Sequence, residues 1–228
     1  MTGVPTPRAG RVVAWARTAL ARHATLACAL TVGFVLLLPL IELLGAHSVN
    51  GVNGFPLDDA WIHLTYARHL HDWHRFAYSL HDAPTAGSTS PLYTALLALF
   101  FGMIRDEKIL SYALDLVFHA VFLGALARWA MDRLGRAEWA IVIVLLVGLD
   151  MRVGILAVSG METSLFLALV ALTFCAHLRG RSLLCGIVLG LAVWTRPEGL
   201  ILAAILFADT LAGGTSAAEG VSPQGNDR

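Results

Sequence analysis

Long apolar runs separated by short polar segments dominate the pattern along this chain. The first, Thr25–Gly45, contains a single charged residue, Glu42. A helix needs about 20 mostly apolar residues to cross the ~30 Å hydrocarbon core of a membrane. We therefore predict a membrane-spanning helix here, since the run is longer than the apolar core of a signal peptide. Four preceding arginines favour a cytoplasmic amino terminus: Arg8, Arg11, Arg17 and Arg22.

Further apolar runs predict an all-α integral membrane protein with about six spans. They are Ile109–Ala127, Trp139–Val158, Met161–Leu178, Ser182–Thr195 and Gly199–Ala212. The last two are short, and are either two thin spans or one pair broken at Pro197. The run Pro91–Ile104 is expected to lie in or dip into the outer interface, because a crossing there would move the arginine-rich turn Asp132–Arg136 outside.

This topology divides the chain into three parts. They are a cytoplasmic basic arm (1–24), a transmembrane module (25–212) and a disordered polar tail (213–228). The module carries a long external loop, 46–108, which is expected to contain interfacial helices. External turns are expected near Ser159–Thr163 and Arg196–Gly199.

Composition and charge agree with a membrane protein. The chain of 228 residues is 57% hydrophobic and 14% charged, with a mean hydropathy of +0.70, whereas soluble domains are about 45–50% apolar and about 25% charged. Its 16 basic and 16 acidic residues cancel, which leaves no cationic excess to bind nucleic acid. Cys28, Cys175 and Cys185 lie within apolar runs, where cysteine usually acts as a small hydrophobic residue rather than in a disulfide.

Asp58 and Asp59 open a helical pattern in the external loop. Its apolar face is expected to consist of Ile62, Tyr66, Leu70 and Trp73, so that the helix lies in the plane of the interface. The two aspartates then either only cap this helix or act in catalysis. In the second interpretation one carboxylate accepts a proton from an attacking hydroxyl while the other orients it or holds a metal.

The same loop is rich in histidine. His69, His71 and His74, with His63 and His81 nearby, do not have the i, i+4 spacing of a helical zinc site. We expect a solvated interfacial face and no metal ligation by these histidines.

Three further polar segments flank the apolar runs. Gly87-Ser88-Thr89-Ser90-Pro91 is either a turn with a helix cap or a helix start that faces a phosphate. Gly160-Met161-Glu162-Thr163 and Thr195-Arg196-Pro197-Glu198-Gly199 carry ionisable residues beside predicted spans, which are either functional or paired across helix ends, for instance Arg196 with Glu162. The deeper residues Glu42, Asp115 and His119 are expected to form interhelical hydrogen bonds, with a proton path as the alternative.

Four motifs together resemble the GT-C-fold membrane glycosyltransferases, most closely the bacterial arabinofuranosyltransferase-like members. They are Leu57-Asp58-Asp59-Ala60-Trp61-Ile62 with Tyr66-Ala67-Arg68, Gly87-Ser88-Thr89-Ser90-Pro91-Leu92-Tyr93, Ser159-Gly160-Met161-Glu162-Thr163 and Thr195-Arg196-Pro197-Glu198-Gly199. Their order and spacing are similar to those of the family, and the resemblance covers roughly residues 25–212.

The resemblance implies transfer of a sugar from a polyprenyl-phosphate carrier to a glycan, lipid or protein hydroxyl on the external face of the bacterial cytoplasmic membrane. The essential aspartate of the family maps to Asp58 or Asp59 without a choice between them. On the external side, the cations available to the leaving phosphate are Arg196, Arg152 and Arg68, and the expected supporting residues are Glu162, Glu198, Ser90 and Thr89. No cofactor is implied with certainty, and a divalent metal is left open.

Two departures from the family pattern limit what carries over. Many relatives have an acidic residue where this chain has Ala86, and relatives are usually more than twice as long. The chain is therefore expected to be an amino-terminal module, with a partner subunit as a source of the missing part. The alternatives are a non-catalytic polyprenyl-phosphate-binding subunit or remnant and, from Glu42, Asp115 and His119, a small transporter.

Overall fold

The computed structural model describes residues 23–50, 54–81 and 87–219, and these residues form helices without any strand. The all-α prediction is confirmed. A first helix, 23–35, meets the next at a turn at Leu36. The others are α2 (Leu37–Asn50), α3 (Asp59–Trp73), α4 (Pro91–Phe100), α5 (Glu107–Leu134), α6 (Ala137–Gly148), α7 (Met151–Leu156), α8 (Thr163–Leu178), α9 (Ser182–Thr195) and α10 (Gly199–Glu219).

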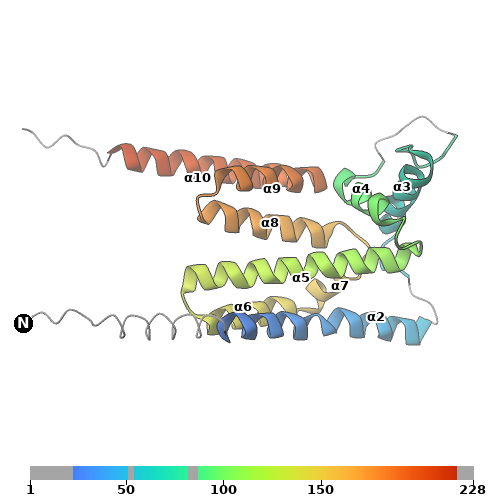
Figure 1. The fold of residues 1–228 in the computed structure, drawn as a ribbon, viewed down its shortest axis with the longest axis horizontal. Helices are drawn as coiled ribbons and strands as arrows, with labels where there is room; N and C mark the ends of the chain where they lie inside the picture. The colour runs from blue at the N-terminus through green and yellow to red at the C-terminus, as the bar shows by residue number, and fades with distance from the viewer. Residues whose placement is uncertain (1–22, 51–53, 82–86, 220–228) are drawn as a thin grey trace, which may run out of the picture.

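The long helices α2, α5, α6, α8, α9 and α10 lie along one common direction, while α3 and α4 sit together at one end (Figure 1). Successive long helices run in opposite directions. As a result α3, α4, the first turn of α5 and the turns 157–162 and 196–198 gather at the same end, which we call the loop end. These are the polar segments that the sequence assigned to one side of a membrane.

Two segments of the described chain are long and apolar enough to cross a membrane, His23–Gly45 and Glu107–Leu134. The other apolar helices are shorter, so the number of spans stays a prediction. The run 139–158 was expected to be one helix, and this is wrong. It breaks after Gly148 because the side chain of Asp150 accepts a hydrogen bond from Arg152 N at 2.9 Å and thereby caps a new helix, α7.

The last two apolar runs form two separate helices that pack against each other. Arg196 is extended (φ −148°, ψ 136°), as expected for a residue that precedes a proline. A Cβ at Gly199 would lie 2.8 Å from Val193 N, so the close turn requires glycine there. Helix α10 continues to Glu219, into the segment for which a disordered tail was predicted, while 220–228 lie outside the described residues, as does most of the basic arm.

An apolar core joins α3 and α4 to the long helices directly beside the loop end. Its buried members include Leu64, Ala67, Tyr93, Leu97, Leu110, Leu165 and Ala192. These residues come from α3, α4, α5, α8 and α9, so the core fixes the position of every element that contributes to the site described below.

The outer faces of the long helices are strongly apolar. Leu183 is 80% exposed and Leu146 is 72% exposed, and many other large apolar side chains of α2, α9 and α10 are also more than half exposed. Exposed apolar surface on this scale is typical of helices that contact lipid or another protein.

Candidate functional site

Helix α3 buries a broader face than expected. Of the predicted apolar residues, Tyr66 is buried and Ile62 and Leu70 are half-buried, and a second row beside them is buried as well. Its buried side chains include Ala60, His63, Leu64 and Ala67, which recur at i, i+3, i+4 and i+7 as on one helix face. Ala67 packs in the core with residues of α4, and Ala60 lies against the turn at Gly160. Trp73, predicted to lie on the apolar face, is exposed. The expectation that His63 belongs to a solvated face is therefore wrong, since only 2% of this residue is exposed.

His63 connects three segments that are distant in the sequence. Its Nδ1 lies 3.0 Å from Ser88 Oγ, and that hydroxyl lies 2.7 Å from Thr94 Oγ1 on α4. On the other side of the ring, Nε2 lies 3.0 Å from Glu162 Oε2, in the turn before α8. We call His63, Ser88, Thr94, Glu162 and Arg196 the His63 cluster.

Arg196 completes the cluster at its exposed edge. Its Nε lies 3.7 Å from Glu162 Oε1 and its Nη2 lies 2.9 Å from Glu198 Oε1. The pairing of Arg196 with Glu162 that the sequence suggested is therefore present. Burial raises the pKa of Glu162, but the adjacent His63 and the Arg196 guanidinium outweigh this, so that its pKa lies below the usual value. Glu162 is accordingly an anion at neutral pH.

A second set of buried polar groups holds the turn that carries Glu162. Asp115 Oδ2 accepts a hydrogen bond from Gly160 N at 2.9 Å, and Asp115 Oδ1 accepts one from Tyr93 OH at 2.9 Å. Gly160 has a φ of +73°, and a Cβ there would lie 2.4 Å from the ring of Phe55. Glycine is thus required both by the backbone conformation and by the close approach of the segment before α3.

The expected interhelical hydrogen bonds of the deeper ionisable residues are found for Asp115 but not for the other two. Glu42 Oε2 and both ring nitrogens of His119 are buried without a hydrogen-bond partner among the described residues. The prediction is wrong for these groups.

Asp58 and Asp59 lie at the exposed start of α3. Asp58 occupies the N-cap position but its side chain makes no capping hydrogen bond, so the capping interpretation fails for that carboxylate. Asp59 is the first residue of α3 and lies one helical turn, i to i+4, from His63, which places both on one face of the helix. Within the part of the chain that the structure describes, no ion pair or hydrogen bond engages either carboxylate.

The structure does not bring the other two candidate phosphate-binding arginines into the cluster. Arg68 forms an ion pair with Glu107, which ties α3 to α5. Arg152 is exposed on α7 and forms no ion pair with any described residue.

Of the two predicted supporting hydroxyls, Thr89 is exposed, whereas Ser90 is fully buried with an Oγ that has no hydrogen-bond partner in the described chain.

Sequence reasoning missed His63, Ser88 and Thr94 as members of one site. The available signal was the spacing of Ala60, His63 and Ala67, which marks a helix face that a neighbour can approach closely.

The other loop histidines have local roles instead: His69 Nδ1 lies 2.8 Å from Ala77 O and His71 Nδ1 lies 2.9 Å from Ala98 O. Among the described residues, no group of three His, Cys, Asp or Glu side chains is arranged to hold a metal.

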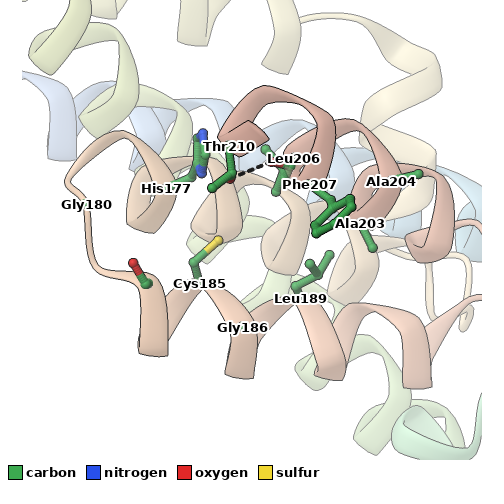
Figure 2. A pocket seen from close by; sticks show the side chains of 11 residues that line it. His177, Gly180, Cys185, Gly186, Leu189, Ala203, Ala204, Leu206, Phe207 and Thr210 are labelled. Atoms are coloured by element: carbon green, nitrogen blue, oxygen red, sulfur yellow. Dashed lines mark hydrogen bonds between the residues drawn. The ribbon is translucent and has the colours of Figure 1, made fainter. Parts of the chain in front are cut away.

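A groove of about 580 Å³ lies between α8, α9 and α10 at the end opposite the loop end. Figure 2 shows its mostly apolar lining, with Leu189 and Phe207 on facing helices and Cys185 on the same helix as Leu189. Its one acid–base pair, His177 with Asp209 at 2.8 Å, lies at the rim. Nothing in this groove matches the predicted chemistry, so the His63 cluster is the candidate site.

Comparisons with known proteins do not place the chain in a family. No family model, no curated protein and no solved structure matches it.

Proposed function

We propose that this chain is a membrane glycosyltransferase, or the catalytic part of one, that transfers a sugar from a polyprenyl-phosphate donor to an acceptor hydroxyl. One observation carries the proposal: all four sequence motifs that resemble the GT-C-fold enzymes contribute residues to the loop end. Three of the motifs meet in the His63 cluster through Ser88, Glu162 and Arg196. The fourth motif, at the start of α3, carries Asp58 and Asp59.

The arrangement of charges suits this reaction. Asp59, or its neighbour Asp58, takes the proton of the acceptor hydroxyl. The hydroxyl oxygen then bonds to the anomeric carbon, and the bond from that carbon to the donor phosphate breaks. The departing phosphate gains negative charge, and Arg196, 33% exposed at the edge of the cluster, is the cation positioned to stabilise it.

The surface of the helices supports a membrane location. Large apolar side chains cover the outside of α2, α6, α9 and α10, which is costly in water and favourable in lipid. Five exposed arginines lie at the end opposite the loop end: Arg128, Arg133, Arg136, Arg179 and Arg181. The loop end carries Arg68, Arg75, Arg105, Lys108, Arg152 and Arg196, but the first four lie in the long segment 46–108. Counted over the short turns, to which the positive-inside rule applies, the excess of arginine favours a cytoplasmic position for the opposite end and an external position for the loop end.

The test is a transfer assay on the full chain in proteoliposomes, with a panel of polyprenyl-phosphate sugars as donors and release of polyprenyl phosphate as the readout. Asp58→Asn and Asp59→Asn are made separately. The matched control is Asp72→Asn, which removes an exposed carboxylate of the same helix that pairs with Arg105. Full activity in both test variants contradicts the carboxylate mechanism.

A non-catalytic polyprenyl-phosphate-binding subunit is the second candidate. It is favoured by one observation: Arg196 is paired with Glu162, whereas neither aspartate carboxylate forms a hydrogen bond or ion pair with a described residue of the cluster. Donor binding that depends on Arg196, without sugar release from any donor, would support this candidate over the enzyme.

A further inference from the structure

Arg196 faces two carboxylates through different nitrogens. Its Nε is directed at Glu162, 3.7 Å away, and its Nη2 is directed at Glu198, 2.9 Å away. The two partners differ greatly in environment, since the side chain of Glu162 is 5% exposed and that of Glu198 is 52% exposed.

Glu162 is held in place and cannot easily leave Arg196. His63 Nε2 lies 3.0 Å from its other oxygen, and a buried carboxylate that loses a counter-charge is strongly destabilised. Glu198 has no buried partner: its carboxylate interacts with its own backbone N–H and with Arg196. An ion pair in contact with water contributes little free energy, so water readily replaces either partner.

The extended backbone at Arg196 and a contact with Phe166 set the direction of the guanidinium. Pro197 keeps Arg196 extended, and the carbonyl of Arg196 accepts a hydrogen bond from Gly199 N at 3.0 Å. The guanidinium also lies over the ring of Phe166, 5.9 Å from its centroid, within the range of a cation–π contact. A change of partner at Nη2 thus requires only a rotation of the Glu198 side chain.

We propose that Glu198 is a displaceable counter-ion, which a phosphate group carried on a polyprenyl chain replaces at Arg196 Nη2 while Glu162 stays at Nε. This inference rests on the proposed function and specifies how the donor phosphate is recognised. Phosphate matches the guanidinium better than a single carboxylate oxygen, because it offers several oxygens to the planar set of donors.

The chain contains a matched control for this arrangement. Arg136-Ala137-Glu138 repeats the Arg-x-Glu spacing at the start of α6, with Arg136 Nε 3.5 Å from Glu138 Oε2. Both side chains are mostly exposed, and among the described residues no buried carboxylate contacts Arg136. Glu138→Gln therefore removes the same charge in the same local context without the fixed partner.

The experiment measures binding of polyprenyl monophosphate to the full chain in detergent micelles. Variants are Glu198→Gln, Glu138→Gln, Arg196→Gln and the double variant Arg196→Gln/Glu198→Gln. We expect Glu198→Gln to lower the Kd by about two- to fivefold, the range that the loss of one exposed ion pair allows. Glu138→Gln should leave the Kd unchanged, and the double variant should bind as weakly as Arg196→Gln alone, because Glu198 acts only through Arg196.

Several outcomes overturn the inference. The inference is wrong if the Kd of Glu198→Gln is unchanged or higher than that of the native chain. It is also wrong if Glu198→Gln lowers the Kd by the same factor when Arg196 is already replaced by Gln. If Glu198→Gln strengthens the binding of uncharged polyprenol by the same factor, the effect concerns the polyprenyl chain and not the phosphate. If Glu198→Gln strengthens the binding of inorganic phosphate but not that of polyprenyl monophosphate, the lipid is not the ligand. Unchanged binding in Arg196→Gln contradicts the donor site of the proposed function itself, which separates that failure from failure of the counter-ion inference.

Discussion

The imidazole of His63 lies 3.0 Å from the carboxylate of Glu162 although α3 and the turn before α8 are far apart in the sequence. Both side chains are almost completely buried. This contact ties the element that carries the two candidate catalytic aspartates to the element that positions Arg196.

The first prediction concerns the stability that His63 provides. His63→Leu removes a hydrogen-bonding partner of both Glu162 and Ser88, so we expect a loss of about 1–3 kcal/mol in the free energy of unfolding. Thermal unfolding in detergent measures it. The exposed His81 gives the control, and an equal effect of His81→Leu would show that the cluster has no special role.

The second prediction concerns pH. Because the pKa of Glu162 is lower in the folded state than its usual value, its carboxylate stabilises the fold fully above the unfolded value of about 4.3. This contribution is lost as the pH falls through the lower, folded value. Glu162→Gln should therefore be less stable than the native chain at neutral pH, and the difference between their Tm values should shrink on acidification. A difference that is the same at every pH would contradict this explanation.

The third prediction concerns the turn before α8. Gly160→Ala puts a Cβ on a residue with φ +73° and within 2.4 Å of the Phe55 ring, which should cost about 1–3 kcal/mol. Gly190 lies inside α9 with nothing within 4 Å of a Cβ. There the same substitution should stabilise by about 0.5–1 kcal/mol, and a loss of stability at Gly190 that equals the loss at Gly160 would remove the conformational argument.

The fourth prediction distinguishes the two aspartates. Asp59 lies on the same helix face as His63, one turn away, whereas Asp58 precedes the helix. If transfer occurs, Asp59→Asn should lower kcat by about 10²–10⁴-fold, the usual contribution of a general base, and Asp58→Asn should lower it less. Measured turnover with a fixed donor decides this, and the reverse ranking would assign the base to Asp58.

The sequence predicted the helices well because long apolar runs carry a strong signal, but it could not locate every break. The run 139–158 is interrupted only by Asp150 and Arg152, and hydropathy alone does not show that the Asp150 side chain caps a new helix. Likewise, alanine fits either a buried or an exposed position. The larger side chains of α3 therefore indicated correctly that Tyr66 is buried, but not that the adjacent row with Ala60, His63 and Ala67 is buried too.

Charge complementarity predicted the contact between Arg196 and Glu162, since both were expected on the same side of the bundle. The partners of His63 could not be predicted in this way. A histidine or serine is compatible with water or with the interior, and only the packing of α3 against α4 decides that Ser88 and His63 are buried together.

The distances in sequence within the His63 cluster also determine when the site can assemble. During synthesis α3 and α4 leave the ribosome well before Glu162, and Arg196 follows later still. Contacts between such distant segments form late in folding, because the chain must first close long loops. A nascent chain that stops before α8 therefore holds its aspartates without the charged partners that complete the site, and only a chain synthesised through the α9–α10 turn has the whole arrangement.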